Sequence, residues 1–194
     1  MALPFTAAQR DAIRSRLFAS AQRHAIADGL QKTSLDTLTS EAGISKSSFY
    51  KFFESKELLF LEVAAGWETD ILSAAAQALA VSAGRSDKER AAAFVFAAFE
   101  RIHMLGIARF MREDMPLLAP FIPGANARAH CLTSAGSIFD ALRRARIRFT
   151  EPDDVVLSVI QLMYLSTMHM GELGDRFFPA LQTLVVSACD RLVA

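Results

Sequence analysis

Apolar residues in the first thirty positions recur at intervals of three and four, which is the spacing of one face of an α-helix. Thr6 with Gln9 three residues later matches a capping box, and Gly29 suits the left-handed turn that ends many helices. We therefore predict a first helix from near Thr6 to Gly29. Its apolar positions are Ile13, Leu17, Phe18, Ala21, Ala25 and Ile26.

Two shorter segments with helical spacing of apolar residues follow the first helix. Thr33 or Ser34 can cap a helix that ends at Gly43. Ser45 can cap another helix over residues 46–53, and the glycine between them permits the positive φ of a sharp turn. Two short helices joined in this way form a helix-turn-helix, a module that can place its second helix in the major groove of DNA.

The next predicted helix has no break from Ser55 to about Ser82, which corresponds to a length of roughly 40 Å. A helix of this length is more typical of a connector between two bodies than of an element in one small core. We therefore predict two domains, residues 1–54 and residues 55–194.

Apolar residues at helical spacing also dominate the remainder of the chain. A helix is expected from Asp87, followed by an irregular, proline-containing stretch around residues 116–124. Further helices are expected over residues 126–148, 153–170 and 179–193. The predicted fold class is all-α, in which a three-helix helix-turn-helix domain is joined by a long helix to a larger helical domain.

Composition and charge agree with a folded protein that has one basic end. The chain has 194 residues, of which 52% are hydrophobic, so it can bury a large core. The net charge is zero, but residues 1–56 carry eight Lys/Arg and five Asp/Glu, a net charge of +3, and the remainder carries −3. A basic domain on an acidic body is typical of a protein that contacts phosphates with one end.

The two cysteines, Cys131 and Cys189, lie far apart in apolar helical patterns without a C-x-x-C or Cys/His spacing. This arrangement argues against a zinc site or a disulfide framework and indicates a reduced, cytoplasmic protein. The N-terminus carries charge early, unlike a signal peptide. The longest uncharged run, residues 155–171, contains polar residues and is short for a bilayer crossing, so no membrane partner is expected.

Polar side chains around the predicted turn are placed to contact DNA. Lys46, Ser47 and Ser48 lie at the start of the motif's second helix, where recognition helices meet base edges. Lys56 is an unusual cation for a helix start, and a neighbouring phosphate would offset its repulsion by the helix dipole. Each lysine could instead be an ordinary solvated charge. The expected DNA-binding residues are Thr33, Ser34, Ser45, Lys46, Ser47, Ser48, Tyr50, Lys51 and Lys56.

Three short sequences carry a resemblance to a known family: AGISK at residues 42–46, FYKFF at residues 49–53 and SKELL at residues 55–59. At this spacing the stretch resembles the N-terminal domain of TetR-family transcriptional regulators, and it covers about a quarter of the chain. Ser47 stands where the family often has glycine, and Phe49 is bulkier than the frequent leucine. The resemblance implies a DNA-binding regulator.

The helices expected over residues 153–170 and 179–193 are apolar around most of their circumference, so each needs cover on several sides. Complete internal burial would provide this cover, and so would a second chain. A two-fold dimer also suits a pseudo-palindromic DNA site, and the TetR resemblance implies that the last two helices form the dimer interface. We therefore expect a homodimer.

The body is rich in Phe and Met, which provide either a well-filled core or the adaptable walls of an apolar ligand site. Polar residues among them could orient a ligand or be satisfied by backbone carbonyls. We expect a small-molecule effector that is apolar or aromatic. The expected ligand-binding residues are Phe99, His103, Met111, Met163, Tyr164, Thr167 and Met168.

The sequence contains no G-x-S-x-G, G-x-G-x-x-G, P-loop or H-E-x-x-H motif, so we predict neither an enzyme nor a cofactor or metal site. The predicted function is a ligand-responsive transcriptional regulator, acting as a repressor that binds a pseudo-palindromic operator as a homodimer and is released by its effector. The alternative is a helical ligand-binding or adaptor protein without sequence-specific DNA binding.

Overall fold

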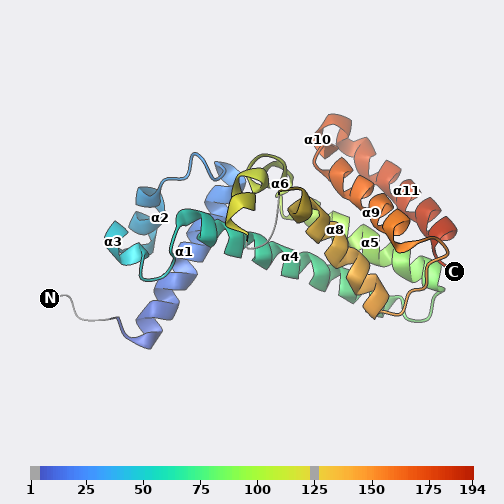
Figure 1. Ribbon diagram of the computed structural model, residues 1–194, viewed down its shortest axis with the longest axis horizontal. Helices are drawn as coiled ribbons and strands as arrows, with labels where there is room; N and C mark the ends of the chain where they lie inside the picture. Colours follow the sequence, from blue (N-terminus) through green and yellow to red (C-terminus); the bar gives the residue numbers. More distant parts are fainter. Residues whose placement is uncertain (1–4, 123–126) are drawn as a thin grey trace. The chain divides into compact units, whose positions relative to one another are not determined.

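A computed structural model describes residues 5–122 and 127–194 of the chain, without the side chains of residues 127–134. Within these ranges the regular structure is helical, and the one extended pairing is an isolated antiparallel bridge between Phe149 and Val193. The predicted all-α fold class is therefore confirmed (Figure 1). Asn126, the predicted start of one helix, and the side chain of Cys131 lie outside the described residues.

The chain divides into two compact units. The first comprises Met1–Gly66 with Arg109–Pro123, and the second comprises Trp67–Ala108 with Gly124–Ala194. These units are defined by packing and leave the predicted functional division between residues 54 and 55 untested. The long fourth helix contributes residues to both units.

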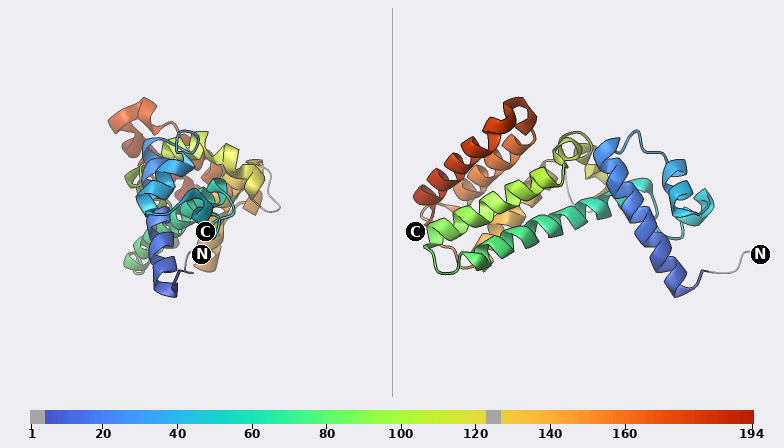
Figure 2. Two further views of the ribbon diagram at one scale, coloured as in Figure 1. Left: turned by 90° about the vertical axis from the view of Figure 1, so that its left-hand side faces the viewer. Right: turned by 180° about the vertical axis from the view of Figure 1, so that it is seen from behind.

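The first unit is built around the predicted helix-turn-helix. Its fully buried large side chains include Leu17, Leu38, Phe49, Phe60 and Phe110, which come from five different helices. Figure 2 shows the first three helices from behind. The elements of this unit are α1 (Ala7–Ala27), α2 (Leu35–Ala42), α3 (Lys46–Phe49), the start of α4 (Lys56–Val81), α6 (Ala108–Glu113), α7 (Met115–Leu118) and η1 (Ala119–Phe121).

Local capping signals place the starts of these helices as predicted. Thr6 accepts a hydrogen bond from the Gln9 N–H, and the Gln9 side chain bonds back to the Thr6 N–H, which completes a capping box. Ser34 and Ser45 each accept a bond from the backbone N–H three residues later. These side chains satisfy N–H groups that a helix start leaves without an intrahelical partner.

Helix α3 is shorter than predicted, because it ends at Phe49 and residues 50–52 form turns. Two carbonyls in these turns are bonded by arginines of α1. The guanidinium of Arg10 donates to the Lys51 carbonyl over 3.3 Å, and that of Arg14 donates to the Phe52 carbonyl over 3.4 Å. These carbonyls are therefore satisfied by side chains instead of by a further helical turn.

The second unit is a helical bundle. Helix α5 packs against α11, and α8 packs against α9; α9 and α11 lie side by side (Figure 1). Helix α8 ends earlier than predicted, because Arg146 adopts a left-handed φ of 63°. The elements of this unit are the remainder of α4, α5 (Asp87–Met104), α8 (Ala127–Arg144), α9 (Asp153–Thr167), α10 (Met170–Leu173), η2 (Gly174–Arg176) and α11 (Phe177–Leu192).

No helix in the described part of the chain is both long enough and apolar enough to cross a membrane.

Gly29 follows the end of α1 at a position that would strain any other residue. Its φ is +83°, and a Cβ there would lie 2.8 Å from Oδ2 of Asp114. Asp114 precedes α7 and is only 5% exposed. The close approach of α1 and α7 therefore depends on the absence of a side chain at residue 29.

We predict that Gly29→Ala lowers the free energy of unfolding of the first unit by about 1–3 kcal/mol, because it adds backbone strain and a clash. Gly136→Ala is the matched control. Gly136 is in α8, and apart from that helix's own backbone no atom of the described residues lies within 4 Å of an added Cβ, so this change should raise stability by up to about 1 kcal/mol. Urea denaturation followed by circular dichroism measures both changes, and equal stability of Gly29→Ala and wild type would contradict the prediction.

Candidate nucleic-acid interface

The turn between α2 and α3 has the geometry of a helix-turn-helix. Gly43 adopts a φ of +70°, its N–H donates to the Ser40 carbonyl, and the Ile44 N–H donates to the Thr39 carbonyl. Ser45 then caps α3, and Phe49 is fully buried beneath it. This geometry fixes which face of α3 is buried and leaves its polar face outward.

The outward face of the motif carries most of the predicted DNA-binding residues. Exposed members of that set are Ser34, Ser45, Lys46, Ser47, Tyr50 and Lys51, and Ser48 is half-buried. The hydroxyl of Ser45 lies 3.0 Å from those of both Ser47 and Ser48. Three hydroxyls therefore gather at the start of α3, where each can exchange its partner for an acceptor or donor on DNA.

Lys46 is held by a weak contact that DNA can replace. Its ammonium pairs with Asp36 of α2 over 2.8 Å, and both side chains are more than half exposed. An exposed ion pair contributes at most about 1 kcal/mol. The ammonium can therefore move to a phosphate or base edge at little cost.

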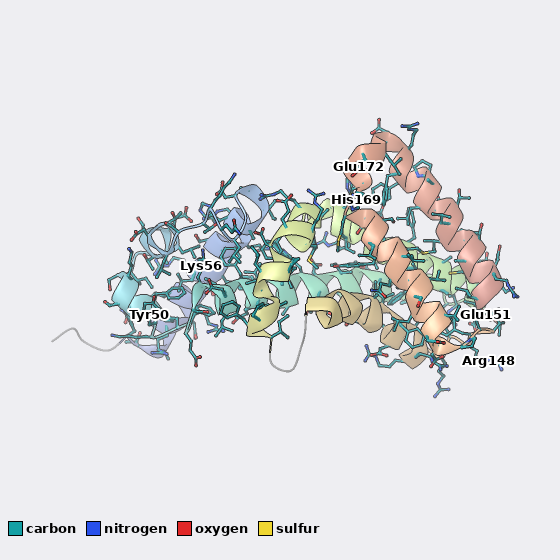
Figure 3. The ribbon with its side chains drawn as sticks, turned by 45° about the horizontal axis from the view of Figure 1, so that its top comes forward. Tyr50, Lys56, Arg148, Glu151, His169 and Glu172 are labelled. Atoms are coloured by element: carbon teal, nitrogen blue, oxygen red, sulfur yellow. The ribbon has the colours of Figure 1, made fainter. Side chains whose placement is uncertain are left out.

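Tyr50 is the most exposed aromatic side chain of the motif, with 59% of its surface accessible. Its ring packs edge-on against Phe49, and Figure 3 locates it beside α3. The ammonium of Lys51 lies 5.7 Å from the ring centroid of Phe5. Both residues present a polar group at the surface of the first unit.

Thr33 and Lys56 have internal partners. The Thr33 hydroxyl is buried and donates to the Gly29 carbonyl over 2.7 Å. The ammonium of Lys56 donates to the carbonyls of Leu30 and Thr33, each over 2.8 Å. The mismatch between this cation and the start of α4 is thus offset by two protein carbonyls, without a phosphate. DNA contact by either residue stays a prediction.

Two arginines on α1 support α3, and sequence reasoning did not identify them. Besides its bond to the Lys51 carbonyl, Arg10 lies 5.3 Å from the Phe52 ring centroid. Arg14 lies 4.6 Å from the Phe53 centroid and pairs with Glu62 of α4. The available signal was the spacing of two arginines four residues apart on a helix that precedes an aromatic cluster.

Residues of α6 and α7 hold the end of α1 in the same unit. Arg109 donates to the carbonyls of Ile26 (3.0 Å) and Ala25 (3.5 Å), which α1 leaves without intrahelical donors. Asp114 accepts the Leu30 N–H, and burial raises the pKa of its carboxyl. Nothing in the local sequence connects these residues with α1, because they lie about 80 positions away.

The predicted ligand-binding residues fall in both units. Met111 lies on α6 in the first unit. The other six lie in the second unit, where Phe99 is fully buried and His103 is exposed, with its ring 4.8 Å from that of Phe178. The hydroxyl of Thr167 donates to the Tyr164 carbonyl. A ligand-binding role for these residues stays a prediction.

The second unit also contains a small apolar cavity of about 20 Å³ between α5, α8, α9 and α11. Met163 is the one predicted ligand-binding residue that lines it, together with Val95, Leu142, Val185 and Cys189. A volume near that of one water-sized probe is too small for an aromatic effector. Burial raises the pKa of the Cys189 thiol to about 12, which leaves it un-ionised and unreactive at neutral pH.

Comparison with known proteins supports the assignment of a helix-turn-helix to α2 and α3. Residues 17–63 match the family model of bacterial regulatory proteins of the tetR family. The match extends from the middle of α1 to the first turns of α4, so it includes all of α2 and α3. The resemblance inferred from the sequence is therefore confirmed, together with its helix-turn-helix and its link to transcription regulation. No curated protein matches the chain.

Solved structures extend the likeness to the whole fold. A TetR-family transcriptional regulator from Pectobacterium atrosepticum is 23% identical, with a TM-score of 0.59 over 96% of this chain and 94% of its own. A regulator of this family from Marinobacter aquaeolei VT8 is 16% identical, with a TM-score of 0.64 over 97% and 99%. RolR in complex with resorcinol is 18% identical, with a TM-score of 0.60 over 94% and 89%. At these identities the likeness shows the fold alone.

We predict that Lys56→Met lowers the free energy of unfolding by about 1–3 kcal/mol, because two buried carbonyls lose a charged donor. Lys51→Met is the control, since the ammonium of Lys51 is exposed and its loss should change stability by no more than about 0.5 kcal/mol. Both values come from urea denaturation without DNA. Equal effects of the two substitutions would show that Lys56 is not a structural clamp.

Proposed function

We propose that this chain, which joins a tetR-family segment over residues 17–63 to the fold of tetR-family regulators, is a ligand-responsive transcriptional repressor that binds operator DNA as a homodimer. The match and the fold support a DNA-binding regulator. The single observation that carries the proposal is the helix-turn-helix, in which Phe49 is buried and the polar face of α3 is exposed.

In the proposed complex, α3 enters the major groove. Lys46, Ser47 and Ser48 contact base edges, because they lie at its N-terminal end. The remaining exposed residues of the predicted set, Ser34, Ser45, Tyr50 and Lys51, contact flanking phosphates. Thr33 and Lys56 contribute by fixing the loop between α1 and α2, through the carbonyl contacts described above.

A second copy of the chain is proposed to cover the apolar surface of α9 and α11. These neighbouring helices expose Val155, Leu162 and Leu165 on α9, and Leu184 and Val186 on α11. Leu162 is 67% exposed and Leu184 is 57% exposed. Several exposed leucines and valines on two neighbouring helices favour a protein interface. A two-fold axis through this surface gives each operator half-site its own helix-turn-helix.

The effector is proposed to be a small apolar or aromatic molecule that binds among the predicted residues of the second unit. RolR, which has a similar fold, is known in complex with the aromatic compound resorcinol. Release of DNA requires that the effector bind one conformer of the regulator more tightly than another. Helix α4 and the α5–α6 connection run from one unit into the other and are the proposed routes of coupling.

The alternative function is a helical ligand-binding or adaptor protein. A gel-shift assay against DNA that flanks the chain's own gene distinguishes the two. A salt-sensitive, sequence-preferring complex supports the regulator, and its absence favours the adaptor.

We predict that Tyr50→Phe combined with Lys51→Ala weakens binding to all DNA sequences. Loss of one lysine–phosphate contact should reduce the slope of log affinity against log salt concentration by about 1. Fluorescence anisotropy over a series of salt concentrations measures both quantities. Arg85→Ala, which removes an exposed cation from the second unit, is the control and should leave the slope unchanged. An unchanged slope in the double variant would rule out the proposed docking.

We predict that Leu162→Glu combined with Leu184→Glu converts a dimer into a monomer, because each change buries an unpaired carboxylate in the interface. Both side chains are exposed in the single chain, so the monomer should stay folded. Light scattering coupled to gel filtration gives the molar mass. Val81→Glu, at an 84% exposed position at the end of α4, should remain dimeric. A dimeric double variant would place the interface elsewhere.

A further inference from the structure

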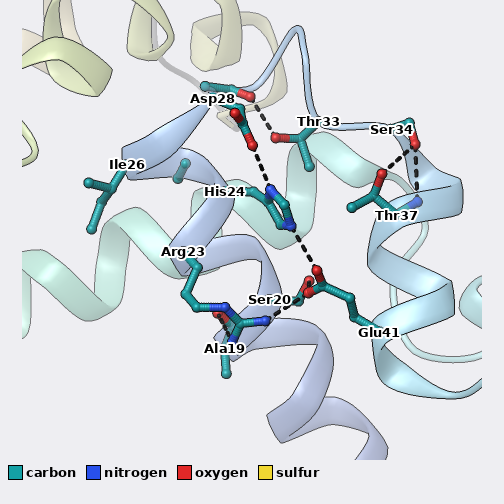
Figure 4. Close-up of polar contacts among 12 residues, drawn as sticks. Ala19, Ser20, Arg23, His24, Ile26, Asp28, Thr33, Ser34, Thr37 and Glu41 are labelled. Carbon is teal, nitrogen blue, oxygen red and sulfur yellow. Dashed lines mark hydrogen bonds and ion pairs between the residues drawn. The ribbon is translucent and has the colours of Figure 1, made fainter.

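The imidazole of His24 bridges two carboxylates in the first unit (Figure 4). His24 lies in the last turn of α1 and is half-buried. Its Nδ1 is 2.7 Å from Oδ2 of Asp28, and its Nε2 is 3.0 Å from Oε1 of Glu41 on α2. Both ring nitrogens therefore face a carboxylate oxygen at hydrogen-bond distance.

Only a protonated ring can make both contacts. An ionised carboxylate accepts hydrogen bonds but cannot donate one, and a neutral imidazole carries a single N–H. Glu41 is ionised here, because its other oxygen accepts bonds from the Ser20 hydroxyl (2.5 Å) and from Arg23 (2.7 Å). The hydrogen bonds from Ser20 and then from His24 lower the pKa of Glu41 to about 2, with a smaller contribution from the charge of Arg23. The geometry is thus that of an imidazolium between two carboxylates.

This bridge joins the two helices whose relative position defines the helix-turn-helix. Glu41 lies one residue before the end of α2, close to the turn that leads to α3. Asp28 caps the end of α1, at the start of the loop that leads to α2. A neutral ring would keep one contact and lose the other, which loosens either α2 or the end of α1.

We infer that His24 is a pH-sensitive positioning residue, whose imidazolium holds α2 against α1 and whose deprotonation lowers DNA affinity. This inference rests on the proposed DNA-binding function. It adds a response to pH that acts within the DNA-binding unit and is separate from the effector.

The charged groups in this part of the first unit come from α1, α2, α4 and α6. Asp28 and Arg23 lie on or next to α1, and Glu41 lies on α2. Arg109 of α6 and Lys56 of α4 bond backbone carbonyls at the end of α1 and in the α1–α2 loop, including the Asp28 carbonyl, and neither bonds the carboxylates of Asp28 or Glu41. The ring itself therefore faces two anions.

The sign of the pH dependence follows from these neighbours. Hydrogen bonds to Asp28 and then Glu41 raise the pKa of His24 above its ordinary value of 6.5, against a smaller lowering by partial burial. A raised pKa in the folded state means that the stabilisation is complete below pH 6.5. It is lost as the pH rises through the pKa of the folded protein. DNA affinity is thus highest on the acid side and falls toward alkaline pH.

The bridge is tested first without DNA. Long-range ¹H–¹⁵N spectra of the full chain with ¹⁵N-labelled histidine report ring protonation, and the His24 signal is assigned by its loss in His24→Gln. We expect His24 to titrate above pH 6.5 and Asp28→Asn to lower its pKa. His169→Gln is the control, since His169 has a single carboxylate partner in the second unit and its loss should leave His24 unchanged. Titration of His24 at or below pH 6.5 overturns the bridge.

The consequence for DNA is tested by anisotropy between pH 6.5 and pH 8.5 at constant salt, with DNA selected for binding. Wild type and His169→Gln should lose affinity as the pH rises, and His24→Gln should lose less. Glu41→Gln, which keeps the shape of the side chain, gives a second test if His24→Gln does not fold. An identical pH dependence in wild type and both cluster variants overturns the inference. Failure of wild type to bind DNA at any pH instead overturns the proposed function, independently of the titration of His24.

Discussion

The helix-turn-helix depends on how the carbonyls at the end of α1 and in the loop that follows are satisfied. A helix leaves its last carbonyls without intrahelical donors, and a buried carbonyl without a partner is costly. Here the donors are two cationic side chains distant in sequence. Arg109 of α6 bonds the last carbonyls of α1, and Lys56 of α4 bonds those of Leu30 and Thr33. The position of α2, and hence of α3, therefore depends on α4 and α6.

Local sequence signals were enough to predict where most helices of the first unit begin. Ser34 and Ser45 are caps because each hydroxyl satisfies an N–H three residues later, and Gly43 ends α2 because it tolerates positive φ. The turns after α3 could not be predicted in this way, because their carbonyls are bonded by Arg10 and Arg14 on another helix. The partners of Lys56 were likewise hidden, since they are backbone carbonyls 23 and 26 residues earlier.

The surfaces proposed to carry function differ in chemistry. The exposed face of α3 and its flanks carries hydroxyls, lysines and one tyrosine, which suit base edges and phosphates. The exposed face of α9 and α11 carries leucine and valine, which suit a second copy of the chain. A third feature, the contact between α1 and α2, is held by Lys56 of α4 and by the His24 bridge. Under the proposed function, a change at this contact would alter DNA binding without altering any residue proposed to contact DNA.

The central claim is that a homodimer of this chain presents two identical helix-turn-helix motifs, one from each copy, to one DNA duplex. Selection of binding sites from a random pool of double-stranded DNA tests it most directly. The account predicts enrichment of an inverted repeat whose half-sites are centred about one helical turn apart, or a multiple of it, with one dimer or more bound per site. Recovery of no preferred sequence, or of a single half-site bound by one chain, would contradict it.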